Sequence, residues 1–187
     1  MRPFWTVSGR NFILIRAPVS MKMPSDTSGT ECDVTEAVGT DLPWVREAVA
    51  QCALLAVSPE DLERLGRDTI VNRALSEYQR LRDSMAGPTA TFVAKSPVGE
   101  RLGMVLVMTT FEANSGESVG WIVCLYVAPE HRSKGVGRRL MSEAESWARS
   151  MSLRKMALTV GPVNEQASRL YETMGYSVES LYMAKSL

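Results

Sequence analysis

The sequence predicts a single mixed α/β domain in which one central sheet is covered by helices. The first observation behind this prediction is the order of the expected elements: strand, two helices, three strands, helix, strand, helix, strand. The second is a strand over 119–127 that is apolar on both faces, as expected in the middle of a covered sheet. The third is the helix after it, whose apolar residues recur four or three positions apart. They are Val136, Leu140, Ala144, Trp147 and Met151.

Composition excludes several classes of function. With 187 residues, the chain has the length of one domain. Its formal net charge of zero argues against nucleic acid or an anionic membrane as partner, and no apolar run approaches the ~20 residues of a membrane helix. The 3 cysteines are odd in number and far apart, which indicates reduced thiols and a cytoplasmic location. Because His131 is the only histidine and no Cys-x-x-Cys exists, we expect no metal site.

The N-terminal segment differs from the rest of the chain. Residues 1–25 contain four basic residues and no acid, and their longest apolar run, Phe12–Ile15, is shorter than the core of a signal peptide. We interpret residues 1–30 as a poorly structured basic extension or a misassigned start, with Met21 or Met23 as the true first residue. A short basic targeting segment is the second interpretation. The globular domain is predicted over 31–187.

The first half of this domain is expected to be mostly helical. A short strand over 32–38 precedes a helix capped by Asp41. The apolar stripe of that helix is Val45, Val49, Cys52 and Leu55. Ser58-Pro59 is a second helix start, and Gly66 is expected to interrupt this helix before a longer piece over 68–85. Gly87-Pro88 ends it.

The second half alternates strands and helices. Strands are predicted over 89–95 and 102–111, and a loop over 112–118 leads to the apolar strand 119–127. After the striped helix come a strand over 155–160 and a helix capped by Asn164 and stopped by Gly175. A strand-like tail over 178–187 closes the chain.

The turn between strand 119–127 and its helix has the chemistry of an anion site. Four cations, Arg132, Lys134, Arg138 and Arg139, surround two glycines. Free amides at a helix start, the helix dipole and these cations would suit a pyrophosphate. The alternative is an ordinary turn with solvated arginines. Neither the Walker loop nor the dinucleotide fingerprint fits, because Arg138-Arg139 and Leu140 occupy their required positions.

A second informative stretch is the helix over 164–175. Ala167, Leu170, Tyr171 and Met174 share one face, so Tyr171 is expected on the buried side. Core packing alone would explain an aromatic residue there.

Together these stretches resemble a known family. Val127-Ala128-Pro129-Glu130-His131-Arg132-Ser133-Lys134-Gly135-Val136-Gly137 resembles the acetyl-CoA pyrophosphate loop of the GNAT superfamily of N-acetyltransferases. Asn164, Ala167, Tyr171, Gly175 and Tyr176 have the spacing of the second signature of that superfamily. The resemblance covers residues 32–187 and is strongest from Trp121 onward.

The resemblance implies a strongly twisted sheet split into a V between the strands 119–127 and 155–160. The pantetheine arm of acetyl-CoA would lie in the split and pair with backbone groups of Leu125, Tyr126 and Val127. The N–H groups of the loop would hold the pyrophosphate, and the loop residues are Arg132, Ser133, Lys134, Gly135, Val136, Gly137 and Arg138. Lys134, Arg138 or Arg139 would reach the outer phosphates, and Asn164 would lie near the pantetheine or acetyl group.

The implied chemistry is direct attack of a neutral amine on the thioester. Tyr171 has the position of the residue that protonates the leaving thiolate in many members, and the Val127 N–H would polarise the carbonyl. The base does not carry over, because Trp121 stands where some members have a glutamate. The alternatives for that role are Glu117, Glu112, Glu47 or a chain of ordered water. Trp121, Trp44 and Tyr78 could line the acceptor pocket.

The resemblance therefore predicts an acetyl-CoA-dependent N-acetyltransferase acting on a primary amine of a small molecule or protein. An inactive acyl-CoA sensor or scaffold is the alternative, and a nucleic-acid module is disfavoured by the zero net charge. The sequence does not identify the acceptor. Dimers are common among proteins that the chain resembles, so a homodimer is one option.

Overall fold

The computed structural model describes residues 14–16, 31–83, 87–112, 115–161, 163–181, 183 and 185. The strands are β1 (Leu14–Arg16), β2 (Asp33–Glu36), β3 (Thr89–Lys95), β4 (Arg101–Phe111), β5 (Ser118–Val127), β6 (Met156–Leu158) and β7 (Ser177–Ser180). The α-helices are α1 (Leu42–Ala56), α2 (Pro59–Leu65), α3 (Arg67–Asp83), α4 (Val136–Ser150) and α5 (Glu165–Thr173). Two short 3₁₀ turns, η1 (Gly39–Asp41) and η2 (Pro129–His131), precede α1 and α4.

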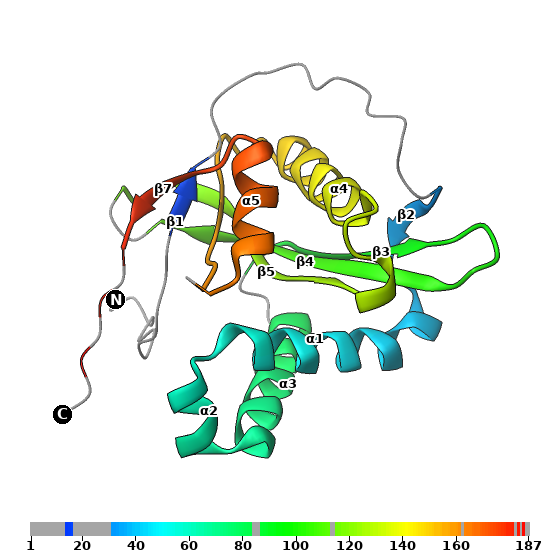
Figure 1. The fold of residues 1–187 in the computed structure, drawn as a ribbon. Coiled ribbons are helices and arrows are strands. Elements are labelled where there is room, and N and C mark those ends of the chain that lie inside the picture. The colour runs from blue at the N-terminus through cyan, green and yellow to red at the C-terminus, as the bar shows by residue number, and fades with distance from the viewer. Residues whose placement is uncertain are drawn as a thin grey trace.

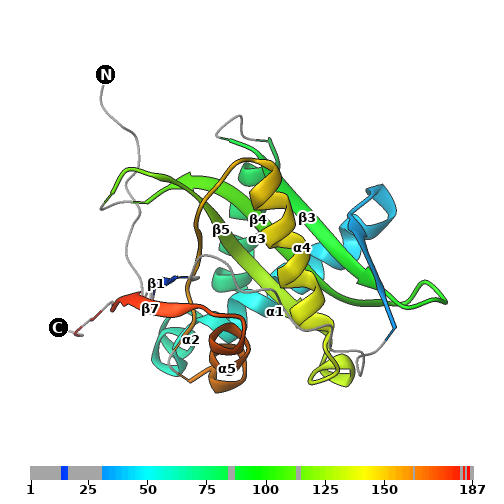
Figure 2. The same cartoon turned by 90° about the horizontal axis from the view of Figure 1, so that it is seen from above.

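The centre of the molecule is a five-stranded sheet in the order β2-β3-β4-β5-β6. Neighbours up to β5 are antiparallel, whereas β5 and β6 are parallel and joined by the crossover helix α4. Helices α4 and α5 cover one face, and α1, α2 and α3 lie on the other (Figures 1 and 2). The predicted mixed sheet covered by helices is confirmed, with the apolar strand β5 between two neighbours.

Each face of the sheet has its own apolar cluster. Under α4 and α5, residues such as Leu140, Val105 and Ile122 are buried together. Under α1 and α3, the cluster contains Val45 and Tyr78. A strand between two such layers must be apolar on both sides, which explains the unbroken apolar run of β5.

The sheet opens along β5. Strand β6 pairs with β5 only from Gly120 to Ile122. At that point the pairing of β5 with β4 shifts register, because Val123 is an extra residue between Ile122 and Cys124. Such a β-bulge bends and twists a strand, so the last residues of β5 diverge from β6 and do not pair with it. The predicted V between these two strands is confirmed.

The helical layer agrees with the sequence at most positions. Ser58 caps α2 by accepting from the Asp61 N–H at 3.1 Å, and Gly66 separates α2 from α3 as expected. The prediction for Asp41 was wrong in one respect, because its side chain makes no capping bond to α1. It instead accepts from Lys95 and Arg101, each at 2.8 Å. The predicted helix end at 85 lies outside the described residues.

Two ends of elements also differ from expectation. Met151 follows α4 and is exposed, so the buried stripe continues through Ala148 instead. Among the described residues of the tail, the strand spans Ser177–Ser180; part of the predicted 178–187 lies outside the described residues.

The structure describes three residues of the predicted N-terminal extension, and these three form a strand. Leu14–Arg16 is the strand β1, which pairs antiparallel with β7 in a separate two-stranded sheet. The expectation of a poorly structured segment is wrong for these three residues, and the sequence signal for them was only the short apolar run. The domain boundary itself stays a prediction. Among the described helices, none is long and apolar enough to cross a membrane.

Candidate functional site

Beyond the bulge, alternate residues of β5 present their backbone groups to the gap beside β6. Ala128 donates its N–H to the Leu102 carbonyl at 2.9 Å, so it faces β4. Because neighbouring residues in a strand point their backbone groups to opposite sides, Leu125 and Val127 face away from β4. On that side the pairing with β6 has already ended. In the described part of the chain, an open strand edge therefore presents these two N–H groups to an extended ligand.

Tyr126 does not share this orientation. It lies opposite Met104, in the half of the alternation whose backbone groups face β4. Its ring packs with the cluster under α1 and α3 and meets Trp44 edge-on, with ring centroids 6.0 Å apart. The expectation that Tyr126 pairs with a ligand through its backbone is therefore wrong, whereas Leu125 and Val127 have the required orientation.

The two carbonyl groups on the open edge are held by side chains. Arg132 donates from Nε to the Val127 oxygen at 3.0 Å, and the Cys52 thiol donates to the Leu125 oxygen at 3.3 Å. The backbone N–H of Arg132 donates to Pro129 at 3.3 Å. Arg132 was predicted as a phosphate ligand through that N–H, and this group is already engaged. Its side chain instead ties the loop to the strand edge.

The start of α4 has the free amides that the sequence predicted. Gly135 precedes the helix with φ of 84°, and no side chain caps the helix there. The N–H groups of Val136, Gly137 and Arg138 have no partner inside a helix that begins at Val136. They point out of the helix start together with its dipole, which suits an anion.

The two glycines of the loop meet different structural requirements, a backbone conformation at Gly135 and close packing at Gly137. Gly135 has a left-handed conformation that side chains rarely adopt. At Gly137, a Cβ would lie 3.2 Å from Leu170 of α5 and 3.6 Å from Val127. Gly137 therefore permits close packing of α4 against α5 and β5. Ligand binding by either glycine stays a prediction.

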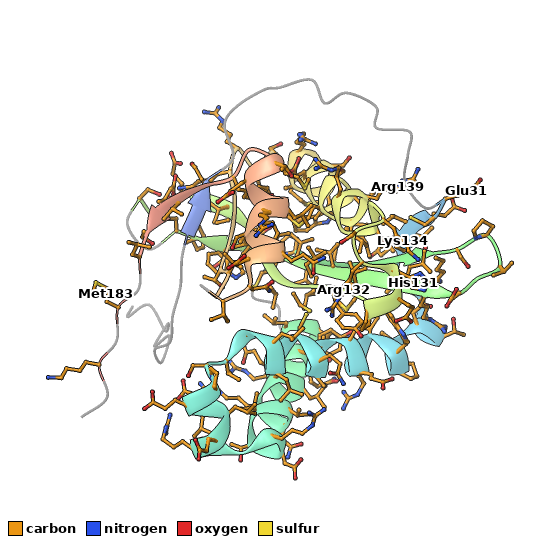
Figure 3. The ribbon with its side chains drawn as sticks, in the orientation of Figure 1. Glu31, His131, Arg132, Lys134, Arg139 and Met183 are labelled. Atoms are coloured by element: carbon orange, nitrogen blue, oxygen red, sulfur yellow. The ribbon has the colours of Figure 1, made fainter. Side chains whose placement is uncertain are left out.

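Some cationic side chains of the loop are exposed to solvent, and others hydrogen-bond to protein groups. Figure 3 shows Arg132, Lys134 and Arg139 at the end of β5 and the start of α4. Lys134 is exposed, and Arg138 reaches Thr173 of α5 at 2.9 Å. Arg139 hydrogen-bonds to the Cys32 carbonyl at the start of β2, so its guanidinium is engaged away from the helix start. Ser133, also exposed, accepts from Gln166 at 3.0 Å.

Tyr171 lies buried on α5, only 6% exposed, on the face of the sheet opposite α1. Burial, followed by the nearby Cys52 and Cys124, raises the pKa of its phenol, which stays protonated in the neutral range. The ring of Tyr176 packs against it at 6.0 Å between centroids, and the Tyr176 hydroxyl is held by Glu145 at 3.3 Å. Leu125 and Val127 pack against the cluster that contains Tyr171, so a neutral phenol lies on the side of the open strand edge.

Asn164 is confirmed as the cap of α5. Its Oδ1 accepts from the Ala167 N–H at 3.2 Å, and its carbonyl oxygen accepts from the Ser168 hydroxyl at 3.1 Å. These bonds account for the side-chain oxygen of Asn164 and set the direction of α5. A contact of Asn164 with a ligand stays a prediction.

Two of the candidate bases are neighbours, because the Glu112 N–H donates to the Glu117 carbonyl at 2.9 Å, whereas the third, Glu47, lies on α1. Glu112 accepts from Lys155 at 2.7 Å and from Ser115 at 2.6 Å, so it belongs to an ion pair. Glu117 is an exposed residue of the loop before β5. Glu47, on α1, lines a cavity with Trp44 and Tyr126. Of these three carboxylates, only Glu47 lies on the helix that borders the open edge.

That cavity has a volume of about 280 Å³ and lies between α1 and the end of β5. Its polar lining includes Glu47, Gln51 and Glu130, beside the rings of Trp44 and Tyr126. Tyr78, also predicted for the acceptor side, lines a different cavity of about 390 Å³ next to β2 and β3. Trp121 is half-buried within the sheet, between Met108 and Ala157.

Two features were not singled out from the sequence. Cys52 was predicted only as part of an apolar stripe, and its thiol meets the strand edge. At the surface of η2, ligand atoms of Glu100, Glu130 and His131 lie within 4.8 Å of one another. Exposed acidic groups of this kind are common without an ion, and we assign no metal to them.

The arrangement of elements defines a class of protein. A putative acetyl transferase from Pyrococcus furiosus superposes with a TM-score of 0.71 at 23% identity, covering 84% of this chain and all of that one. The aminoglycoside acetyltransferase AAC(6')-Iy, solved in complex with a bisubstrate analog of CoA, has a TM-score of 0.62 at 18% identity. That match covers 84% of this chain and 99% of the other. The fold is therefore that of acetyltransferases.

The family follows from the sequence comparison. The model of the Acetyltransferase (GNAT) family matches residues 49–176, and the chain belongs to this family. The uncharacterized N-acetyltransferase YhfO of Bacillus subtilis is 32% identical over 82 residues, 44% of this chain and 55% of its own. The streptothricin acetyltransferase of Streptomyces lavendulae is 30% identical over 133 residues, 71% of this chain and 62% of its own. The chain thus spans about half to two thirds of the length of these relatives.

Proposed function

We propose that the protein is an acetyl-CoA-dependent N-acetyltransferase that acetylates a primary amine of a small molecule by direct attack. The observation that carries this proposal is the open edge of β5, flanked by the uncapped start of α4 and by Tyr171. An acyl-CoA needs these three things: a polar edge for its pantetheine amides, an anion site for its pyrophosphate, and a proton donor near its sulfur.

The residues present fit the cofactor. The N–H group of Leu125 would pair with the pantetheine arm, and the N–H group of Val127 would polarise the thioester carbonyl. The pyrophosphate would be held by the loop N–H groups from Ser133 to Arg138, with the exposed Lys134 as a nearby cation. The relative AAC(6')-Iy has been solved with CoA, which supports this choice.

Tyr171 would protonate the departing thiolate of CoA. Burial keeps its phenol protonated at neutral pH, so the proton is available when charge develops on sulfur. The attacking amine must itself be neutral. We assign the role of base to Glu47, which lines the cavity between α1 and β5. Water in this cavity would carry the proton from the amine to the Glu47 carboxylate.

A small-molecule acceptor is favoured by the relatives and by the cavity. A streptothricin acetyltransferase and an aminoglycoside N(6')-acetyltransferase type 1 are among the relatives, at 30% and 31% identity. Their names denote acetylation of streptothricin and of an aminoglycoside, which are small molecules. The cavity of about 280 Å³ is lined by two carboxylates, two aromatic rings and Arg101, whose charge is paired with Asp41. This lining suits an ammonium-bearing compound of modest size.

The test is calorimetric titration with acetyl-CoA and with dephospho-CoA, followed by a screen of amines for acetyl transfer. We expect acetyl-CoA to bind, and we expect acetyl transfer to at least one small amine. Binding without turnover on any amine would favour the alternative, an acyl-CoA sensor. No binding of acetyl-CoA would contradict the assigned site.

A further inference from the structure

Two cysteines, Cys52 and Cys124, lie near each other at the opening beside β5. Cys124 is buried in the cluster under α1 and α3, and Cys52 of α1 packs against the same cluster. The Cys52 sulfur lies 3.3 Å from the carbonyl oxygen of Leu125, the neighbour of Cys124 in the chain. A hydrogen bond with Cys52, together with burial, raises the pKa of the Cys124 thiol. Both thiols therefore belong to one apolar cluster, and the Cys52 sulfur lies against the backbone of the residue that follows Cys124.

The pair lies across the opening from the phenol that we place in the reaction. The Leu125 carbonyl that Cys52 binds belongs to the open edge of β5, and Leu125 also packs against the cluster on the other face of the sheet that contains Tyr171. Cys52 is half-buried, so a small molecule can reach it, whereas Cys124 is shielded. Cys32, the third cysteine, is buried beside Arg139 at β2.

We propose that Cys52 and Cys124 are a site of reversible oxidation, at which an intramolecular disulfide closes the acetyl-transfer cleft. The oxidant is a small disulfide such as oxidised glutathione. The Cys52 thiolate first attacks it, forms a mixed disulfide and releases one small thiol. The Cys124 thiol then attacks the Cys52 sulfur, and its proton goes to the departing sulfur, which leaves as the second small thiol. The protein loses two hydrogens and two electrons, and the oxidant is reduced to two thiols.

The disulfide between Cys52 and Cys124 would change the cleft by moving the open edge of β5. In the reduced protein, the Cys52 thiol satisfies the carbonyl of Leu125 at 3.3 Å. In the disulfide this hydrogen is absent, and the sulfurs approach more closely than hydrogen-bonded thiols do. Strand β5 must then shift relative to α1 at the residues that present the N–H groups to the cofactor. Displacements of about 1 Å at such positions cost roughly 100-fold in rate. The effect on acetyl-CoA rests on the proposed function, whereas the thiol chemistry does not.

The experiment oxidises the full chain in oxidised and reduced glutathione and reads three quantities: intact mass, the linked peptide, and acetyl-CoA affinity by calorimetry. We expect a loss of about 2 Da, a peptide joining Cys52 to Cys124, and at least tenfold weaker acetyl-CoA binding, all reversed by dithiothreitol. The matched control Cys32→Ser should behave like the wild type. In Cys124→Ser, only a glutathione adduct at Cys52 should form.

Three outcomes would overturn the proposal. One is a wild-type protein that carries glutathione on Cys52 without a link to Cys124. Another is a link that forms and leaves acetyl-CoA affinity unchanged. The third is a reduced protein that binds no acetyl-CoA, which would remove the gating together with the proposed function. If the disulfide proposal fails and the proposed function holds, the reduced protein still binds acetyl-CoA and acetylates an amine.

Discussion

The Nε of Arg132 lies 3.0 Å from the carbonyl oxygen of Val127, five residues earlier in the chain. This bond joins the anion loop to the end of the open strand. Because the N–H of Val127 belongs to the same open edge, one contact sets the position of the loop relative to the strand that would bind the pantetheine arm. Arg132 is thus a positioning residue for both parts of the site.

Loss of this contact should weaken cofactor binding. A hydrogen bond from a charged group contributes about 1.5–3 kcal/mol, so we expect Arg132→Ala to raise the Kd for acetyl-CoA roughly 10- to 100-fold. Arg132→Lys should recover little, because an ammonium lacks the planar donor geometry. Calorimetry measures both. Arg80→Ala, which removes an exposed partner of Glu77 on α3, is the control and should leave Kd unchanged. Equal effects of the two alanine variants would contradict the positioning role.

Two substitutions at Gly135 separate strain from charge. Any side chain at φ of 84° costs about 1–2 kcal/mol, so Gly135→Ala should lower the free energy of unfolding by that amount. Gly135→Asp adds a carboxylate at the anion site and should abolish detectable acetyl-CoA binding. Thermal denaturation and calorimetry check the two effects. If the aspartate variant bound acetyl-CoA as well as the alanine variant does, the loop would not be the pyrophosphate site.

Tyr171→Phe should reduce turnover and leave the cofactor bound. General acid catalysis typically contributes 10²- to 10⁴-fold, so we expect kcat to fall within about that range while the Kd for acetyl-CoA changes by less than about twofold. Because the folded pKa of Tyr171 is raised, its ionisation should cause no loss of rate as the pH rises to about 10. Tyr176→Phe is the matched control, since its hydroxyl contacts Glu145. A similar fall in kcat for both variants would indicate packing and not proton donation.

Asp41 should make stability depend on pH in the acid range. Burial raises its pKa, but the hydrogen bonds from Lys95, the Val38 N–H and Arg101 outweigh it and lower the pKa to about 2. A lowered folded pKa stabilises the protein above the unfolded value of 3.8, and this stability is lost as pH falls toward 2. Since Lys95 and Arg101 are partly exposed, we expect about 1–2 kcal/mol.

Urea denaturation of wild type and Asp41→Asn at several pH values tests this expectation. The difference in unfolding free energy should be present at pH 6 and should shrink between about pH 4 and pH 2. Glu165→Gln removes an exposed helix pair with Arg169 and serves as the control. A difference that stays constant down to pH 2 would show that the charge of Asp41 contributes nothing.

Deletion of residues 1–25 should separate the extension from the site. It removes β1 and exposes the edge of β7, so a modest fall in Tm is expected. None of the described residues of the open edge or the anion loop lies in this segment, and the Kd for acetyl-CoA should stay the same. A truncated protein that fails to fold or to bind would show that the extension belongs to the domain.

The order of the elements could be predicted because each has a local signal. The stripe of α4, the cap at Ser58, the break at Gly66 and the left-handed Gly175 depend only on residues close in the chain. Strand β1 and the short pairing of β6 could not be predicted. Their partners are far away in sequence, and three-residue strands have too few positions to show a period.

The site divides in the same way. The amino-acid sequence by itself determined the fold class, the loop around Gly135, and the presence of Tyr171 on a buried helix face, because periodicity and turn chemistry are local. Only the tertiary structure decided what each group does. It turned Leu125 and Val127 toward the opening and Tyr126 away from it, engaged Arg132 and Arg139, and brought Cys52 to Cys124. These outcomes depend on strand register, the bulge at Val123 and the packing of α1, which arise only when distant segments meet.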